Sequence, residues 1–458
     1  MRRRSFRLFS RRALGLTALV ASLALTASAC SSSAPQVVVV TVTSGQQAQQ
    51  PAVSAPELST PAQSQGSATG ALTSASTTAP TTAPGSDVRI TATPAFGAKN
   101  VPPNDPVKVT VFAASITQLT LAGDDGREIA GAVSSDKASW TNSQRLTYAT
   151  TYTYAGIAAA KDGKQTKISG KFTTVKPTAT ERASVQIPNG DTVGVAAPII
   201  VTFSGVVKNR AKAEAALKVT TSAGAALKGN WGWVQDEQIL AKGPVQSQVH
   251  WRPTKSPANP TTPYWPAFTK VHVEADLKGV DYGNGQWGRE DFVSNFSVGR
   301  SQIVVADAST HKLIVTVDDK VTKNYAVSYG KESVPGRATV NGIHVVTEKH
   351  PTFKMCNPKF DYCNVLEKWA VRINNNGEFI HQNLKAKAAF GIANISHGCI
   401  NMGEPDAQDY YNSALYGDPV VVSNTDPSAP GGGPAMSEKD ALYDWIYSPS
   451  DWLALSAL

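Results

Sequence analysis

The composition of the chain changes abruptly near residue 87, and this change limits what each part can fold into. Residues 31–86 are almost entirely Ser, Thr, Ala, Pro, Gln and Gly, and Glu57 is the one acidic residue before Asp87. Such a segment cannot bury enough apolar surface to offset the entropy cost of ordering it. We therefore predict that residues 30–86 form a disordered tether, and that the folded domains of the 458-residue chain follow it.

The residues before the tether are typical of an export signal. Arginines cluster at the start, an apolar run follows from Ala13 to Ala29, and small residues precede Cys30. This order defines a secretory signal peptide, which we predict at residues 1–29. Because Cys30 follows the small residues as in a lipobox, we expect its lipidation, which would hold the exported protein at the outer face of the cytoplasmic membrane, in the cell-wall space. An uncleaved anchor helix and simple secretion are the alternatives.

The net charge gives no support to a nucleic-acid partner. The formal charge is +8, but six arginines lie within the first twelve residues and the chain beyond residue 30 carries only about +2. A strong positive field over the folded domains is therefore absent, and we expect no binding of nucleic acid.

From residue 87 onward, short alternating apolar runs separated by turn residues predict a mainly β protein. Val107, Val109 and Val111 alternate in the first of these runs. Short strands between Pro- and Asn-rich breakers are typical of β-sandwiches, and we predict two immunoglobulin-like domains at 87–176 and 177–300. Five tryptophans of the second domain could form a platform for sugar rings, but packing in the core and at interfaces is the interpretation we favour. They are Trp231, Trp233, Trp251, Trp265 and Trp287.

A third, β-rich domain is predicted at residues 301–423, with a C-terminal extension at 424–458 that packs back on this domain or the preceding one. Asn374–Gly377 is expected to be the turn of a hairpin. The other expected elements are strands at 303–305, 312–317, 324–328, 342–347, 369–373, 378–381 and 418–423, and helices at 406–415 and 438–447.

Three cysteines lie in this third domain. Cys356 and Cys363 enclose a six-residue loop, and two nearby cysteines of an exported protein tend to pair, which would leave Cys399 as a free thiol. Residues 349–366 are expected to form a flap, stiffened by this disulfide. A rival interpretation makes Cys356 and Cys363 zinc ligands together with His344 or His350, but their spacing is not a usual one for zinc, and we expect no metal.

Cys399 lies in a turn of small residues between apolar positions, with His397 two residues and His381 eighteen residues before it. A free thiol, with a pKa of ~8.5, is mostly protonated at neutral pH, and a neighbouring imidazole both activates it and carries its proton to a leaving amine. Gly398 permits a tight bend, which would allow the backbone N–H groups of Gly398 and Cys399 to face a developing oxyanion. These residues predict nucleophilic catalysis by Cys399.

The spacing from His381 to Ser396, followed by Ser-His-Gly-Cys-Ile-Asn, resembles the signature of the L,D-transpeptidases, the YkuD-like catalytic domain of peptidoglycan cross-linking enzymes. The resemblance extends to Ser328-Tyr329-Gly330, to Thr339–Gly342 and to the lipobox, tether and two Ig-like domains of multidomain lipoprotein members. It implies that Cys399 is the nucleophile and His381 the general base and acid, supported by His397, Ser396, Gly398 and Asn401. Substrate or lid contacts are expected from Tyr329, Met355, Tyr362, Trp369 and Gln382.

The resemblance also implies a reaction. Cys399 would attack the third residue of a donor tetrapeptide stem, release D-alanine and pass the acyl group to the side-chain amine of an acceptor stem, giving a 3→3 cross-link. No cofactor would be needed, and carbapenem-type β-lactams would be covalent inhibitors. The alternatives are L,D-carboxypeptidase activity, attachment of wall proteins, and a non-catalytic peptidoglycan-binding lipoprotein.

Overall fold

The computed structural model describes residues 87–458 except 235, 239–241, 427, 429–432 and 438–442. The predicted signal peptide, Cys30 and the tether lie outside the described residues. Among the residues described, 46% are in strands and 10% in helices, which confirms the mainly β prediction. The same residues include no helix with the length and apolar character that crossing a membrane requires.

The first folded part is a β-sandwich of two antiparallel sheets. Val107, Val109 and Val111 are all buried in its core, as their alternation predicts, together with Leu121 and Phe172. One sheet has the strand order β1-β2-β5-β4 and the other β3-β6-β7. The strands are β1 (Arg89–Thr93), β2 (Lys108–Phe112), β3 (Ala114–Gly123), β4 (Gly131–Val133), β5 (Ser139–Asn142), β6 (Thr151–Ala160) and β7 (Gln165–Thr173).

The second sandwich pairs sheets of order β13-β14-β11-β9 and β10-β18-β15-β12, with a small third sheet, β16-β17-β8, beside them. Its five tryptophans are between 2% and 8% exposed, which confirms core packing rather than a sugar platform. The elements are β8 (Ala179–Glu181), β9 (Ala183–Val185), β10 (Thr192–Val193), β11 (Ile199–Phe203), α1 (Arg210–Ala215), β12 (Leu217–Thr221), η1 (Gly224–Ala226), β13 (Lys228–Trp233), β14 (Gln248–Thr254), β15 (Lys270–Ala275), β16 (Asp281–Gly283), β17 (Gln286–Gly288) and β18 (Phe292–Val298).

The third part contains a five-stranded sheet, β21-β20-β19-β27-β22, and a four-stranded sheet, β23-β24-β25-β26. Val304, Leu313, Val371, Ile380 and Ile400 belong to one core cluster that includes residues of both sheets. The strands are β19 (Gln302–Asp307), β20 (Lys312–Val317), β21 (Lys320–Ala326), β22 (Gly342–Val345), β23 (Glu348–Asn357), β24 (Tyr362–Arg372), β25 (Phe379–Gln382), β26 (Ile400–Met402) and β27 (Pro419–Ser423), and the helical elements are η3 (Leu384–Ala389) and α2 (Asp406–Ser413).

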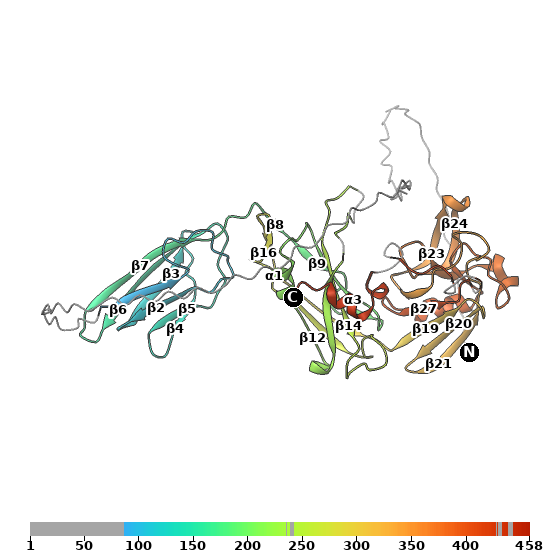
Figure 1. The fold of residues 1–458 in the computed structure, drawn as a ribbon, viewed down its shortest axis with the longest axis horizontal. Coiled ribbons are helices and arrows are strands. Elements are labelled where there is room, and N and C mark those ends of the chain that lie inside the picture. Colours follow the sequence, from blue (N-terminus) through green and yellow to red (C-terminus); the bar gives the residue numbers. More distant parts are fainter. Residues whose placement is uncertain (1–86, 235, 239–241, 427, 429–432, 438–442) are drawn as a thin grey trace, which may run out of the picture. The chain divides into compact units, whose positions relative to one another are not determined.

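The predicted flap is a long β-hairpin. β23 and β24 pair in antiparallel fashion over most of their length and are joined by the 3-10 turn η2 (Pro358–Phe360), as Figure 1 shows. A disulfide between Cys356 and Cys363 closes the tip and confirms the predicted pairing. Because the two sulfurs are bonded to each other, neither is available to ligate zinc.

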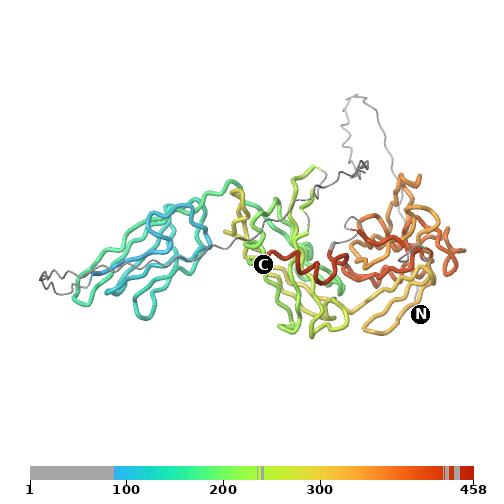
Figure 2. The backbone as a smooth tube through the Cα atoms, in the orientation of Figure 1, coloured from blue at the N-terminus to red at the C-terminus, as the bar shows by residue number. Residues whose placement is uncertain are grey.

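The C-terminal extension packs on the second sandwich and also on the third part, where residues 443–446 contact β22 and the Met436 N–H donates to the Asn341 carbonyl at 2.9 Å. It forms the 3-10 turn η4 (Tyr443–Ile446) and α3 (Pro449–Ala454), and α3 lies against β13, where the red end of the chain runs in Figure 2. The predicted helix 438–447 is described only from residue 443, where it is a 3-10 turn. Ser448, whose side chain accepts the N–H of Asp451 at 3.2 Å, caps the unpredicted helix α3.

Candidate active site

Parallel pairing of β25 and β26 brings the two ends of the sequence motif together. His381 is in register with Asn401, so the turn that carries Cys399, immediately before β26, lies beside the end of β25. A pocket of about 280 Å³ opens at this point. Its lining comes from the flap, β25, η3, the cysteine turn with the residues just before it, and β26: Met355, Phe360, Tyr362, Val365, Glu367, His381, Asn383, Lys385, Ala386, Ile395, Ser396, His397, Cys399 and Asn401.

His381 is buried and held from two sides. Its Nδ1 lies 2.8 Å from the backbone carbonyl oxygen of Gln382 and 3.7 Å from Oε2 of Glu367. Burial alone would lower the pKa of the imidazole, but its hydrogen bond to Cys399 and its contact with Glu367 outweigh burial and raise the pKa to about 10. The site therefore favours a protonated imidazole opposite the sulfur.

Cys399 is the free cysteine among the described residues, and its side chain is partly exposed to the pocket. Its Sγ lies 3.9 Å from the carbonyl oxygen of Gly377, in the turn before β25. Accessibility, a neighbouring imidazole and a free thiol are the conditions for a reactive cysteine.

The turn from Ser396 to Cys399 is fixed by local hydrogen bonds. The Ser396 hydroxyl donates to the carbonyl of Cys399 at 2.5 Å and accepts the N–H of Gly398 at 3.1 Å, while the Thr339 hydroxyl donates to the carbonyl of Gly398 at 2.8 Å. The Gly398 N–H is thus engaged by the hydroxyl of Ser396, two residues before it. The alignment of the Gly398 and Cys399 amides on an oxyanion stays a prediction.

His397 forms part of the pocket wall. Its ring lies 5.4 Å from that of Phe360 and 5.1 Å from that of Tyr362, both near the flap tip. Partial burial and the positive charge of Arg337 lower the pKa of His397, which favours a neutral ring at physiological pH. The Asn383 side chain donates a hydrogen bond to Oδ1 of Asn401 at 2.5 Å, which links the residue after β25 to β26.

The expected substrate and lid contacts divide into two groups. Met355 and Tyr362 line the pocket, and burial together with the neighbouring Cys399 raises the pKa of Tyr362 to about 12. Tyr329, Trp369 and Gln382 are not among the residues that line it, and their side chains contact other parts of the domain. Tyr329 is fully buried and donates to the Lys312 carbonyl, Trp369 packs on Tyr411, and the Gln382 side chain donates to Glu404.

Two residues important to the site are not predicted from the sequence: Glu367, which lines the pocket, and Arg337, which contacts the loop beside it. The strand predicted at 369–373 is longer in the structure and begins at Tyr362. Glu367 and Val365 therefore lie on one face of this strand, which the shorter predicted strand could not indicate. Arg337 donates to the carbonyl oxygens of Ser396 at 3.1 Å and Ile395 at 2.8 Å, and so braces the loop that carries His397.

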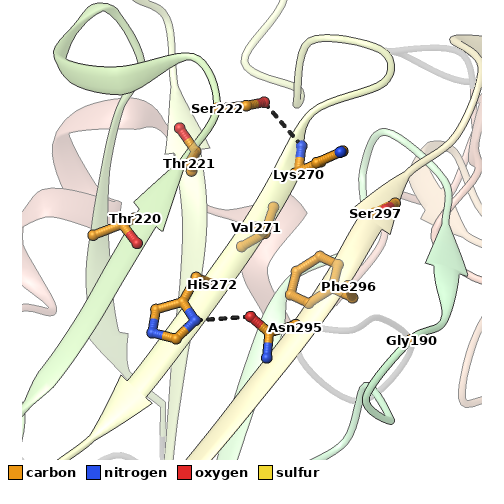
Figure 3. A pocket seen from close by; sticks show the side chains of 10 residues that line it. All are labelled: Gly190, Thr220, Thr221, Ser222, Lys270, Val271, His272, Asn295, Phe296 and Ser297. Carbon is orange, nitrogen blue, oxygen red and sulfur yellow. Dashed lines mark hydrogen bonds between the residues drawn. The ribbon is translucent and has the colours of Figure 1, made fainter.

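A larger hollow of about 480 Å³ lies on the second sandwich, over strands β12, β15 and β18 (Figure 3). His272 and Asn295 face each other there at 2.8 Å, and the Lys270 N–H donates to Ser222. Its lining, which lies wholly within the described chain, offers hydroxyl, amide, amine and imidazole groups but no thiol or carboxylate. It therefore lacks the thiol and the carboxylate that line the cysteine pocket.

A free thiol, a buried imidazole oriented by a backbone carbonyl and a supported turn together define the class of cysteine–histidine acyl-transfer sites. The comparison with known proteins is in agreement. Residues 301–422 match the model of the L,D-transpeptidase catalytic domain, and residues 98–281 match a bacterial Ig domain.

Curated relatives extend this match over most of the chain. L,D-transpeptidase 5 of Mycobacterium tuberculosis strain H37Rv is 40% identical over 81% of this chain and 77% of its own length. L,D-transpeptidase 2 of M. tuberculosis strain CDC 1551 is 30% identical over 81% and 85%. The solved structure of L,D-transpeptidase LdtMt1 in complex with imipenem is 28% identical, covers 52% of this chain and 97% of its own, and gives a TM-score of 0.41. This chain belongs to the L,D-transpeptidase family.

Proposed function

We propose that this protein forms 3→3 cross-links in peptidoglycan through a thioester on Cys399. The observation that carries the proposal is the contact between the accessible thiol of Cys399 and the buried imidazole of His381 at the floor of a pocket. Membership of the L,D-transpeptidase family supports the choice of substrate.

The first half of the reaction uses the imidazolium. The Cys399 thiolate attacks the carbonyl carbon of the third stem residue, and a carbon–sulfur bond forms as the carbonyl oxygen gains negative charge. The protonated His381 then gives its proton to the amine of D-alanine, the carbon–nitrogen bond breaks, and a thioester remains. In the second half, the acceptor amine attacks the thioester and loses a proton to His381, while the thiolate leaves.

The flap gives the transfer its advantage over hydrolysis. Met355, Tyr362 and Val365 place apolar surface over the sulfur, and the disulfide closes the tip beyond them. A site that excludes water lets an amine compete for the thioester. Export, and lipid attachment at Cys30, would bring this site to its polymeric substrate in the cell-wall space, and the predicted tether would supply the reach.

The test combines trapping and product analysis. The full chain is incubated with a carbapenem, whose strained carbonyl acylates the thiol, and its intact mass is compared with that of Cys399→Ala and of a Cys356→Ser/Cys363→Ser control. We expect one adduct on the wild type and on the control, and none on Cys399→Ala. Muropeptides formed from tetrapeptide stems should contain 3→3 dimers with the wild type and with the control, but not with Cys399→Ala. An adduct on Cys399→Ala, or release of D-alanine without dimers, contradicts the proposal.

A further inference from the structure

One carboxylate of the pocket is not used by the reaction as written above. Glu367 lies on β24, its side chain is 15% exposed, and its Oε2 is 3.7 Å from Nδ1 of His381. Within the described residues, His381 is the ion-pair partner of Glu367 at salt-bridge distance. A carboxylate this enclosed retains a strong field because little water screens it.

We propose that Glu367 is a positioning residue that holds His381 in its protonated form opposite Cys399. The inference rests on the proposed function, because it assigns a partner to the acid and base of that reaction. The Gln382 carbonyl, at 2.8 Å, accepts the Nδ1 proton and sets the ring orientation. At 3.7 Å, Glu367 adds charge rather than a second short hydrogen bond.

The Gln382 carbonyl and the Glu367 carboxylate have different effects on His381. A neutral carbonyl orients the ring but offers little compensation for a full positive charge in a buried site, whereas a carboxylate does. Two groups act on His381: Cys399, in the turn before β26, and Glu367, on β24. The other titratable residues of the pocket wall are Lys385, His397 and Tyr362. Among these groups, only the sulfur and Glu367 can carry negative charge at neutral pH, and the sulfur loses its charge when it attacks.

The charge at Glu367 therefore matters most after attack. The thioester-forming step consumes the thiolate, so the imidazolium loses its nearest counter-charge before it has delivered its proton to the leaving amine. Glu367 keeps the proton on the ring during that interval without taking it, since the Nδ1 proton is already donated to Gln382. The carboxylate would equally compensate the imidazolium that forms when the acceptor amine is deprotonated.

The experiment is the pH profile of carbapenem acylation in the full chain, a half-reaction that needs no acceptor. Glu367→Gln keeps the shape and removes the charge. We expect its acylation rate at neutral pH to fall about tenfold, and the high-pH limb of its profile, where the imidazolium is lost, to move about one pH unit lower. The matched control is Glu348→Gln on the paired strand, an exposed residue in contact with His350 and Arg372, which should stay within about twofold of the wild type.

Several outcomes overturn the inference. A uniform rate loss with an unmoved high-pH limb means that Glu367 has only a packing role. Unchanged acylation with a raised KM for the acceptor stem means that Glu367 binds the incoming ammonium group. If Glu367→Gln does not fold, Glu367→Asp, which keeps the charge, must retain the wild-type limb. Failure of the wild type itself to be acylated contradicts the proposed function rather than this inference.

Discussion

At the scale of single residues, Gly398 is a position where the backbone requires glycine. Its φ is +120°, in a region that side chains rarely adopt, and a Cβ there would lie 3.4 Å from Oε1 of the buried Glu378. We expect Gly398→Ala to cost about 1–3 kcal/mol of folding free energy and, because the sulfur shifts with its turn, to slow acylation at least tenfold.

The control for Gly398→Ala is a glycine of similar conformation remote from the site. Gly163, in the first sandwich, has φ +85° and open space around its Cβ position. Gly163→Ala should lower stability by about 1 kcal/mol and leave acylation unchanged. Thermal unfolding and intact-mass kinetics measure both effects. Equal acylation by the two variants would show that the geometry of the turn does not control the thiol.

The sequence predicts the residues of this site best where they belong to the motif from His381 to Asn401. Cys399, Ser396 and His397 lie in one short run, and their neighbourhood could be predicted. Glu367 could not, because its contact depends on how β24 is placed against β25. Trp369 has a left-handed φ of +53°, which interrupts the simple alternation of β24, and its indole packs on Tyr411. The burial of Tyr329 could not be predicted either, since an inward position cannot be recognised from the letters Ser-Tyr-Gly alone.

At the scale of elements, the disulfide makes the flap a constrained hairpin rather than a free loop. Cys356→Ser/Cys363→Ser removes a crosslink from the end of β23 and β24, which on chain-entropy grounds restrains the tip by about 2 kcal/mol. A looser tip admits more water, so we expect the ratio of cross-linked to hydrolysed product to fall at least about twofold. Chromatography of products from a single tetrapeptide stem measures that ratio. An unchanged ratio would mean that the flap excludes water without help from its disulfide.

Element boundaries show where local sequence patterns stop being sufficient. The strand predicted at 324–328 is β21, Lys320–Ala326, because Ser328 leaves it and forms an isolated bridge with Asn401. The helix predicted at 406–415 ends at Ser413, since Ala414 is extended. Both boundaries coincide with tertiary contacts, since Arg300 donates to the Ser413 carbonyl and Lys349 to the Ala414 carbonyl. The hairpin turn at Asn374–Gly377, which depends on local conformation alone, was predicted correctly.

At the scale of the whole molecule, the C-terminal extension ties itself to the second sandwich by aromatic and buried polar contacts. The Arg252 guanidinium lies 4.8 Å from the ring centre of Trp445 and 4.5 Å from that of Trp452, and it donates to the carbonyl of Asp444. His250 and Asp444 form a buried pair at 2.9 Å. The sequence predicts that the extension packs on the third domain or the preceding one. The individual contacts could not be predicted, because they depend on which side chains β13 and β14 present to the extension.

Substitution of Trp452 tests how much the extension stabilises the second sandwich. Its indole is fully buried against Gly232, where an added Cβ would lie 2.9 Å from the ring, and its Nε1 donates to the Asn230 carbonyl. Trp452→Ala should destabilise the second sandwich by about 3–5 kcal/mol, whereas Leu453→Ala, 57% exposed, should change it by less than about 0.5 kcal/mol.

Denaturant unfolding followed by tryptophan fluorescence measures the two variants. The core cluster that includes His381's neighbour Ile380 does not include Trp452, so carbapenem acylation should survive the substitution even as the sandwich weakens. Two small and equal stability changes would mean that the extension rests on the surface without supporting it. Loss of acylation together with the sandwich would instead mean that the catalytic domain depends on the extension for its own folding, through the contact between η4 and β22.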